Sequence, residues 1–161
     1  MGAWLHHQRL GFNYRMSELS AALGVTQMAR LDQFIDRRAA VAAMYNERLR
    51  DLPWLRRPVV RPEVSMSWFV YVATLAEGLN RDSVMTEMQA RGIPVRAYFE
   101  PIHLQPYTRD EHRPDPGSLP VTESLARRTV ALPFHNRLTE AEVDTVVEAL
   151  RAVASEFHAV D

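Results

Sequence analysis

Residues 68–75 constrain the fold more than any other segment, because they read Trp-Phe-Val-Tyr-Val-Ala-Thr-Leu. Most of these side chains are β-branched or aromatic, which favours an extended strand. Successive side chains of a strand point to opposite faces of a sheet, so this strand is apolar on both faces. Strands of this kind are covered on both sides, as the inner strands of layered α/β domains are. The segment therefore predicts a central strand in a sheet flanked by helices.

The chain before this strand has a helical pattern over residues 17–52. Ser17 can cap a helix start, and Glu18 suits the positive end of the helix dipole in the first turn. Apolar side chains then recur at helical spacing. Gly24 interrupts the run, which favours two successive helices or one bent helix over a straight rod. Residues 1–16 are predicted to form an irregular arm.

Helices and strands alternate after residue 52. The expected elements, in chain order, are an exposed connection with prolines over 53–62, the strand at 68–75, a helix capped by Asn80 and stopped by Gly92, and a strand over 93–99. A loop over 100–119, a helix over 122–128 and a short strand over 129–132 are expected next. Thr139 and Glu142 open a last helix, and the inward face of this helix is predicted to be Val143, Val146, Val147, Leu150 and Val153. Loops as long as 100–119 are usually functional or disordered. This order predicts an α/β layer arrangement, a small sheet flanked by helices.

The composition excludes one kind of covalent chemistry, because the chain has 19 basic residues and none of them is lysine. Arginine keeps its charge, whereas lysine can lose its proton and attack a carbonyl group as an amine. A reaction that joins a lysine side chain to a carbonyl cofactor is therefore closed to this chain alone. Cysteine is also absent, which removes disulfides and thiolate catalysis.

Several classes of partner are not expected. The net charge of −1 provides no electrostatic basis for binding nucleic acid or an anionic membrane. No segment approaches the roughly 18 consecutive apolar residues of a membrane span. The start of the chain lacks the long apolar region of a signal peptide, so a cytoplasmic location is expected. The histidines lack the spacing of zinc motifs, so no metal site is expected.

Residues 11–19, Gly-Phe-Asn-Tyr-Arg-Met-Ser-Glu-Leu, carry the clearest sign of a binding site. They set the amide of Asn13 and the guanidinium of Arg15 just ahead of a helix N-terminus. Backbone N–H groups, the helix dipole and an arginine together suit a phosphate or a carboxylate. The alternative is a capped helix whose arginine only solvates a surface turn, and one helix start does not decide between the two.

This segment and those that follow it resemble the DegT/DnrJ/StrS aminotransferases. The matching stretches are residues 11–19, 21–24, 30–32, 37–38, 67–71, 91–93, 98–107, 132–134 and 138–140. The family consists of pyridoxal-phosphate enzymes of the aspartate-aminotransferase architecture (fold type I) that aminate keto-sugars attached to nucleotides. The resemblance implies that residues 53–161 are the small C-terminal domain of that architecture. It also implies that residues 17–52 are the long connecting and interface helices, preceded by the arm 1–16.

The resemblance implies roles for individual residues as well. Asn13 corresponds to a residue that reaches across a dimer interface to the cofactor phosphate. Arg15 lies near it in the family and would meet the carboxylate of the amino donor or another anion. The expected substrate-binding residues, near the sugar-nucleotide pocket, are Tyr98, His103, Gln105 and Tyr107. For His103 a purely structural hydrogen bond is the alternative.

The part of the family that carries the lysine has no counterpart in this chain. In the family an N-terminal large domain supplies the covalent lysine, the aspartate that pairs with the pyridine nitrogen and most of the phosphate site. Pyridoxal phosphate is therefore expected only in a complete assembly, and without a covalent link to this chain. The chain is either one half of a split enzyme with a lysine-bearing partner, a non-catalytic truncated remnant that folds and self-associates, or an expressed fragment of a longer enzyme. Apolar faces over residues 19–49 that lack their partners predict an oligomer, a hetero-assembly or a poorly soluble monomer.

Overall fold

The computed structural model describes residue 9 and residues 11–108 and 117–158, with side chains described as far as Ala154. The chain divides into two units, Met1–Gln33 and Phe34–Asp161. No helix of the described residues is both long and apolar enough to cross a bilayer.

The first unit contains an irregular segment over residues 11–17 and helix α1 (Glu18–Met28). Ser17 caps α1 as predicted, because its side chain accepts a hydrogen bond from the backbone N–H of Ser20. No residue of α1 is buried. The other residues of the predicted arm, 1–8 and 10, lie outside the described residues.

The predicted interruption of the helical run exists, but it does not fall at Gly24. Gly24 lies inside α1, and the chain turns at Ala29 and Arg30 before α2 (Leu31–Arg48) begins. A glycine within a helix costs only about 1 kcal/mol relative to alanine, which is too little to end the helix by itself. Two successive helices are therefore confirmed, whereas the predicted position of the break is wrong.

The described strands form one sheet in the order β1-β2-β4-β3, and every pairing is antiparallel. The strands are β1 (Leu55–Arg56), β2 (Tyr71–Leu75), β3 (Arg96–Ala97) and β4 (Thr129–Leu132). The predicted central strand is β2, which lies between β1 and β4 and begins at Tyr71 rather than Trp68. In its register with β4, Tyr71 lies opposite Leu132.

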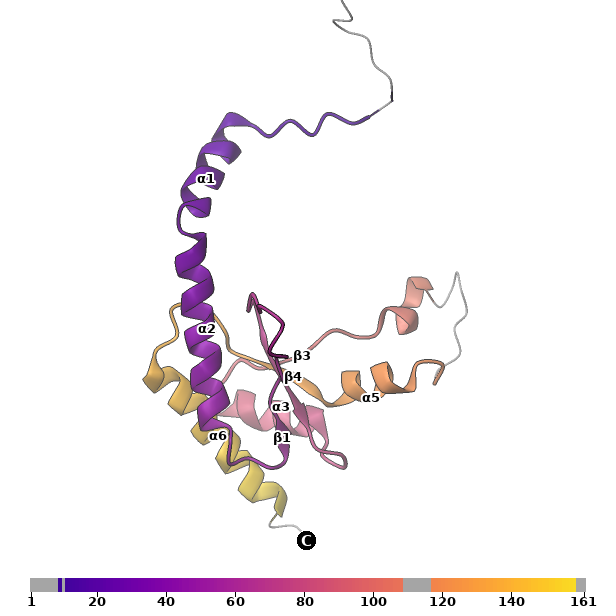
Figure 1. The fold of residues 1–161 in the computed structure, drawn as a ribbon. Coiled ribbons are helices and arrows are strands. Elements are labelled where there is room, and N and C mark those ends of the chain that lie inside the picture. Colours follow the sequence, from indigo (N-terminus) through magenta and orange to yellow (C-terminus); the bar gives the residue numbers. More distant parts are fainter. Residues whose placement is uncertain (1–8, 10, 109–116, 159–161) are drawn as a thin grey trace, which may run out of the picture. The chain divides into compact units, whose positions relative to one another are not determined.

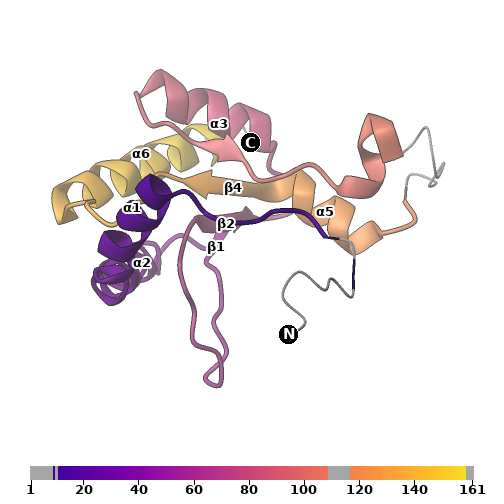
Figure 2. The ribbon, with the colours of Figure 1, turned by 90° about the horizontal axis from the view of Figure 1, so that it is seen from above.

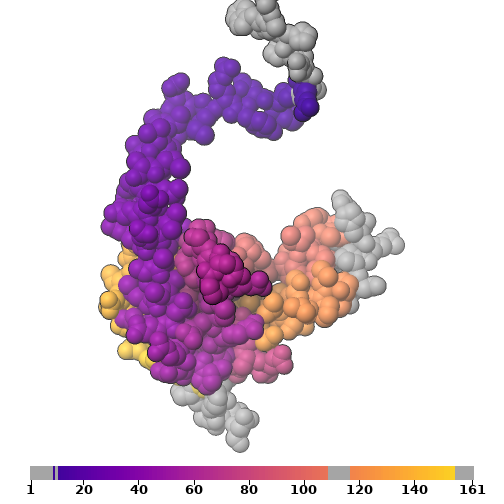
Figure 3. Space-filling view, in the orientation of Figure 1, coloured from indigo at the N-terminus to yellow at the C-terminus, as the bar shows by residue number. Residues whose placement is uncertain are grey.

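Two strands differ from the prediction in length or in existence. The strand expected over 93–99 is only two residues long. Ile93 and Val95, whose apolar side chains favoured a strand, are buried but precede it. β1 was not predicted, because its two residues lie among prolines that indicate an exposed connection. The connection itself is confirmed beyond β1: the loop between β1 and β2 exposes Val59, Val64 and Phe69, and it lies at the front of the view in Figure 3.

Helices α3 (Arg81–Ala90) and α6 (Glu140–His158) pack together on one side of the sheet (Figures 1 and 2). Asn80 caps α3 by accepting the backbone N–H of Ser83 at 3.0 Å, and Gly92 takes the positive φ of +78° that ends the helix turn. The side chains that α6 buries are those predicted: Val143, Val146, Val147, Leu150 and Val153. Val41, Ala42 and Tyr45 of α2 belong to the same core.

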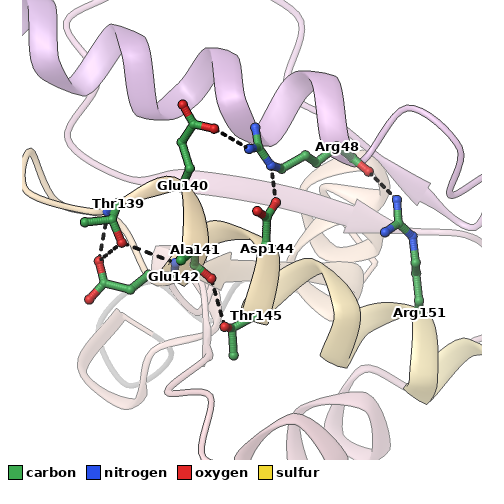
Figure 4. Close-up of polar contacts among 8 residues, drawn as sticks. All are labelled: Arg48, Thr139, Glu140, Ala141, Glu142, Asp144, Thr145 and Arg151. Carbon is green, nitrogen blue, oxygen red and sulfur yellow. Dashed lines mark hydrogen bonds and ion pairs between the residues drawn. The ribbon is translucent and has the colours of Figure 1, made fainter.

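The start of α6 carries the predicted capping box, and the same region ties α6 to α2 (Figure 4). The backbone N–H of Thr139 donates to Oε2 of Glu142 at 2.8 Å, and the N–H of Glu142 donates back to Thr139 Oγ1 at 3.3 Å. The backbone N–H and the hydroxyl of Thr139 lower the pKa of Glu142. Arg48 of α2 donates to Glu140 at 3.1 Å and to Asp144, so one guanidinium joins the two helices.

Candidate pocket and anion-binding arm

The second face of the sheet is only partly covered, and this leaves a pocket. Along β2 the buried residues alternate with partly exposed ones, and Val72 and Thr74 lie on the partly exposed face. In β4 the same alternation leaves Thr129 partly exposed. Helix α5 (Pro120–Arg128) contacts β2 at this face. The prediction of a sheet flanked on both sides is therefore only partly correct, because α5 covers just part of this side.

The pocket has a volume of about 760 Å³ and is lined mostly by apolar side chains. Val72 and Thr129 form its floor on the sheet, and Leu125 of α5 forms one wall. The segment 98–103, which runs into η1 (Ile102–Leu104), also lines the pocket. Three stretches that are far apart in the sequence thus meet at one surface.

Two of the four predicted substrate-binding residues line this pocket, Tyr98 and His103. The Tyr98 ring packs against that of Phe99, with 4.7 Å between centroids. Gln105 and Tyr107 do not line it: Gln105 has its Nε2 3.5 Å from a carboxylate oxygen of Glu100, and Tyr107 is 61% exposed. The structure thus brings Tyr98 and His103 together and leaves the other two beside the pocket.

The predicted loop over 100–119 is more ordered than expected. It contains η1 and a helical stretch at residues 106–108, and α5 already begins at Pro120. Proline is favoured at the first positions of a helix, because the backbone N–H that it lacks would have no partner there. The middle of the loop, residues 109–116, lies outside the described residues.

Beside the pocket lies a buried carboxylate that the sequence did not single out, Glu123 of α5. It is 7% exposed, and among the described residues it is the only buried side chain that is polar or charged. Its Oε1 lies 3.1 Å from Nε2 of His103 and accepts the backbone N–H groups of Gly117 at 2.8 Å and Leu119 at 3.4 Å. No motif marks Glu123, because an acidic residue in a first helical turn is common on protein surfaces.

The hydrogen bonds of Glu123 stabilise its charged form. The bond with His103 lowers the pKa of Glu123 against the opposing effect of burial, and the N–H groups of Gly117 and Leu119 lower it further. His103 therefore does make the structural hydrogen bond that was one of its two predicted roles. It also lines the pocket, so the structural contact and a contact with a ligand do not exclude each other.

The arm carries the second candidate site. Asn13 and Arg15 are both exposed, and Oδ1 of Asn13 accepts the backbone N–H of Arg15 at 3.1 Å. This bond leaves the amide N–H groups of Asn13 and the guanidinium of Arg15 available as donors, since the described residues show no hydrogen bond from either. Exposed apolar side chains flank them, with Phe12 at 84% and Tyr14 at 87%. The exposed donors of the arm can hydrogen-bond to an anion, but the arm does not enclose a binding site.

The described part of the chain holds no cluster of three or more side chains that could bind a metal ion. Side chains at the pocket and at the arm can form hydrogen bonds and ion pairs with a ligand.

Comparison with known proteins identifies the family. The sequence pattern of the DegT/DnrJ/EryC1/StrS aminotransferase family matches residues 2–151. DesV of S. venezuelae, solved in complex with a ketimine intermediate, is 33% identical with a TM-score of 0.83, and the match covers 95% of this chain and 41% of DesV. A DegT DnrJ EryC1 StrS aminotransferase from Brucella abortus is 32% identical with a TM-score of 0.79, over 94% of this chain and 39% of that one.

A third similar structure is TlmJ, an aminotransferase from Streptoalloteichus hindustanus, with 26% identity and a TM-score of 0.80 over 94% of this chain and 40% of TlmJ. The chain thus spans about two fifths of the length of these aminotransferases. Since the family pattern runs through both the arm and the pocket, and covers all but the ends of the sequence, the chain belongs to the DegT/DnrJ/EryC1/StrS aminotransferase family.

Proposed function

We propose that this chain is the C-terminal portion of a pyridoxal-phosphate-dependent sugar aminotransferase. The reaction is the transfer of an amino group to a nucleotide-linked keto-sugar, for the synthesis of polysaccharides or glycosylated metabolites. The observation that carries the proposal is the family match over residues 2–151. Residues 53–161 are then the small domain, joined by the helices of residues 17–52 to the arm.

Pyridoxal phosphate, when bound, supplies a carbonyl group that reacts with amines and a ring that takes up electron density. The residues of this chain fit only part of that cofactor. Asn13 and Arg15 offer donors that suit its phosphate or the carboxylate of an amino donor. No lysine is present among these 161 residues to hold its carbonyl group, so the complete assembly needs a lysine from outside them.

The pocket beside His103 is the proposed place of the sugar nucleotide. Its apolar lining suits the flat, less polar face of a sugar or a base, and a few polar groups at its edge fix orientation. Tyr98 and His103 are two such groups in the lining. Gln105 and Tyr107 lie close by in sequence, and we assign them contacts with the part of the substrate that extends out of the pocket.

The exposed apolar side chains of α1 support the need for a partner. Leu19 is 84% exposed, Leu23 62% and Met28 66%, and none of the α1 side chains is buried. Large exposed apolar surface is typical of association sites. The large domain of a lysine-bearing chain, or a second copy of this chain, is the proposed cover.

An absorbance titration with pyridoxal phosphate tests the proposal. The chain is titrated alone and then mixed with a lysine-bearing protein of the same family, such as the product of the adjacent gene. A new visible band that forms only in the mixture supports a split transaminase. No band in either sample favours the non-catalytic remnant. A band from the chain alone contradicts the argument from the missing lysine.

A matched pair of variants tests the arm in the same experiment. Asn13→Asp places a negative charge where the phosphate is expected, so the mixture should bind the cofactor roughly tenfold more weakly, which corresponds to about 1.4 kcal/mol. Asn136→Asp makes the same change in the second unit and should have no effect. Equal affinity of the two variants would remove Asn13 from the cofactor site.

A further inference from the structure

Glu123 gathers donors from two segments on either side of residues 109–116. His103 lies before that stretch, and Gly117 and Leu119 lie after it. The guanidinium of Arg127 is 4.0 Å from the other carboxylate oxygen, Oε2. A buried carboxylate is costly unless it is hydrogen-bonded, and here three donors converge on one of its oxygens. This arrangement holds η1 and the start of α5 to each other.

The carboxylate of Glu123 favours one tautomer of the His103 ring. An ionised carboxylate accepts hydrogen bonds and donates none, so Nε2 of His103 is the donor in this contact. In a neutral imidazole one nitrogen donates and the other accepts. In the neutral ring, Nδ1 then has no proton. Among the described residues, no hydrogen bond engages Nδ1, while the ring lines the pocket of about 760 Å³.

We propose that Glu123 is a positioning residue that holds His103 in its Nε2–H form, so that Nδ1 acts as a hydrogen-bond acceptor toward a ligand in the pocket. A lone pair on nitrogen accepts hydroxyl or ammonium protons. It has nothing to offer an ionised phosphate, which also only accepts. The group that meets His103 is therefore a sugar hydroxyl and not the diphosphate. Only this last assignment rests on the proposed function, because the form of the ring is a property of this chain alone.

Nitrogen-15 NMR of the histidine-labelled chain tests the proposal without cofactor or partner. The spectra are recorded in mildly alkaline buffer. The His103 signals are assigned by their loss in His103→Asn. We expect a proton bound to Nε2 that is protected from exchange with water, and an Nδ1 signal typical of an unprotonated nitrogen. A proton on Nδ1, or an Nε2 proton that exchanges freely, overturns the proposal.

Two further measurements separate positioning from packing. Glu123→Ala should remove the protection of the Nε2 proton and mix the two ring forms, whereas Glu148→Ala, an exposed site on α6, should change neither. An unchanged His103 spectrum in Glu123→Ala overturns the role of Glu123. Addition of inorganic phosphate should leave the Nδ1 signal in place, and a shift of that signal overturns its assignment as an acceptor for hydroxyl groups. Failure of the cofactor titration would leave these readouts unaffected, so the two proposals fail separately.

Discussion

The phenolic hydroxyl of Tyr71 donates a hydrogen bond to Oδ1 of Asn46 at 2.7 Å, which joins the central strand to α2. Tyr71 is fully buried, and burial raises the pKa of its hydroxyl, so the group remains a donor at neutral pH. The ring also lies 4.9 Å from that of Tyr45, whose own hydroxyl donates to the carbonyl of Pro133 at 2.8 Å. Two tyrosines thus bind polar groups at the edge of an apolar core.

Tyr71→Phe removes this hydroxyl with little change in packing. We expect the free energy of unfolding to fall by about 1 to 2 kcal/mol, because the bond is lost and the half-buried Asn46 loses its partner. Urea denaturation followed by circular dichroism measures the change. The control is Tyr107→Phe, whose side chain is 61% exposed and which should be neutral. Equal losses in the two variants would show that the Tyr71 bond contributes nothing specific.

Arg48→Met keeps the apolar stem of the side chain and removes the guanidinium that contacts Glu140 and Asp144. Both carboxylates are well exposed, at 73% and 50%, so the expected loss is only about 1 kcal/mol at low salt. The loss should shrink as salt is added, because ions screen the pairs. The comparison is Arg50→Met, an exposed arginine two residues on, measured at both salt concentrations. A loss that does not respond to salt would point to packing instead of charge.

Stability should fall in acid, and Glu123 should account for part of the fall. Its pKa lies below the ordinary value of 4.5 in the folded chain, so the folded state binds fewer protons than the unfolded state. The stabilisation is therefore present above about pH 4.5 and is lost as the pH falls through the folded pKa. Glu142 acts in the same direction. Among the residues that the structure describes, the charged or titratable groups that face Glu123 are His103 and Arg127.

Urea midpoints measured from about pH 7 down to about pH 3 test this. Glu123→Gln removes the titrating group, so its stability should depend less steeply on pH than that of the wild type. Glu148→Gln should keep the full dependence. Parallel curves for wild type and Glu123→Gln would mean that the lowered pKa of Glu123 contributes nothing to acid unfolding.

Self-association should depend on the exposed apolar side chains of α1. The triple variant Leu19→Gln, Leu23→Gln and Met28→Gln should have a lower mass by size-exclusion chromatography with light scattering. Its unfolding midpoint should not drop, because none of these side chains is buried in the isolated chain. Val59→Gln, at an exposed position in the loop between β1 and β2, is the matched control. A wild-type chain that stays monomeric in dilute solution would contradict the expected association.

Local signals predicted the starts of α1, α3 and α6 well, because these starts are encoded within a few residues. Ser17, Asn80 and the pair Thr139 and Glu142 all form the caps that their residue types favour. The inward face of α6 follows directly from helical spacing. Gly24 misled the prediction, since its low helix propensity is a small term beside the neighbouring residues that continue α1.

The pocket was harder to predict, because it is a product of tertiary structure. Tyr98 and His103 came from the family resemblance and lie at the pocket, but Val72, Leu125 and Thr129 join them only once the sheet and α5 have formed. Glu123 carries no local signal at all. Its importance comes from burial and from a partner 20 residues away, neither of which a sequence pattern reports.

The place of β4 in the sheet has a consequence for synthesis on the ribosome. β4 separates β2 from β3, although both of those strands precede it in the chain. The nascent polypeptide therefore cannot close its hydrogen-bond network until residue 132 of 161 has left the exit tunnel. Until then β2 and β3 each present an open edge, and pairing over such separations is slow. The unpaired edges of β2 and β3 are therefore the parts of the growing chain that are most open to mispairing before β4 emerges.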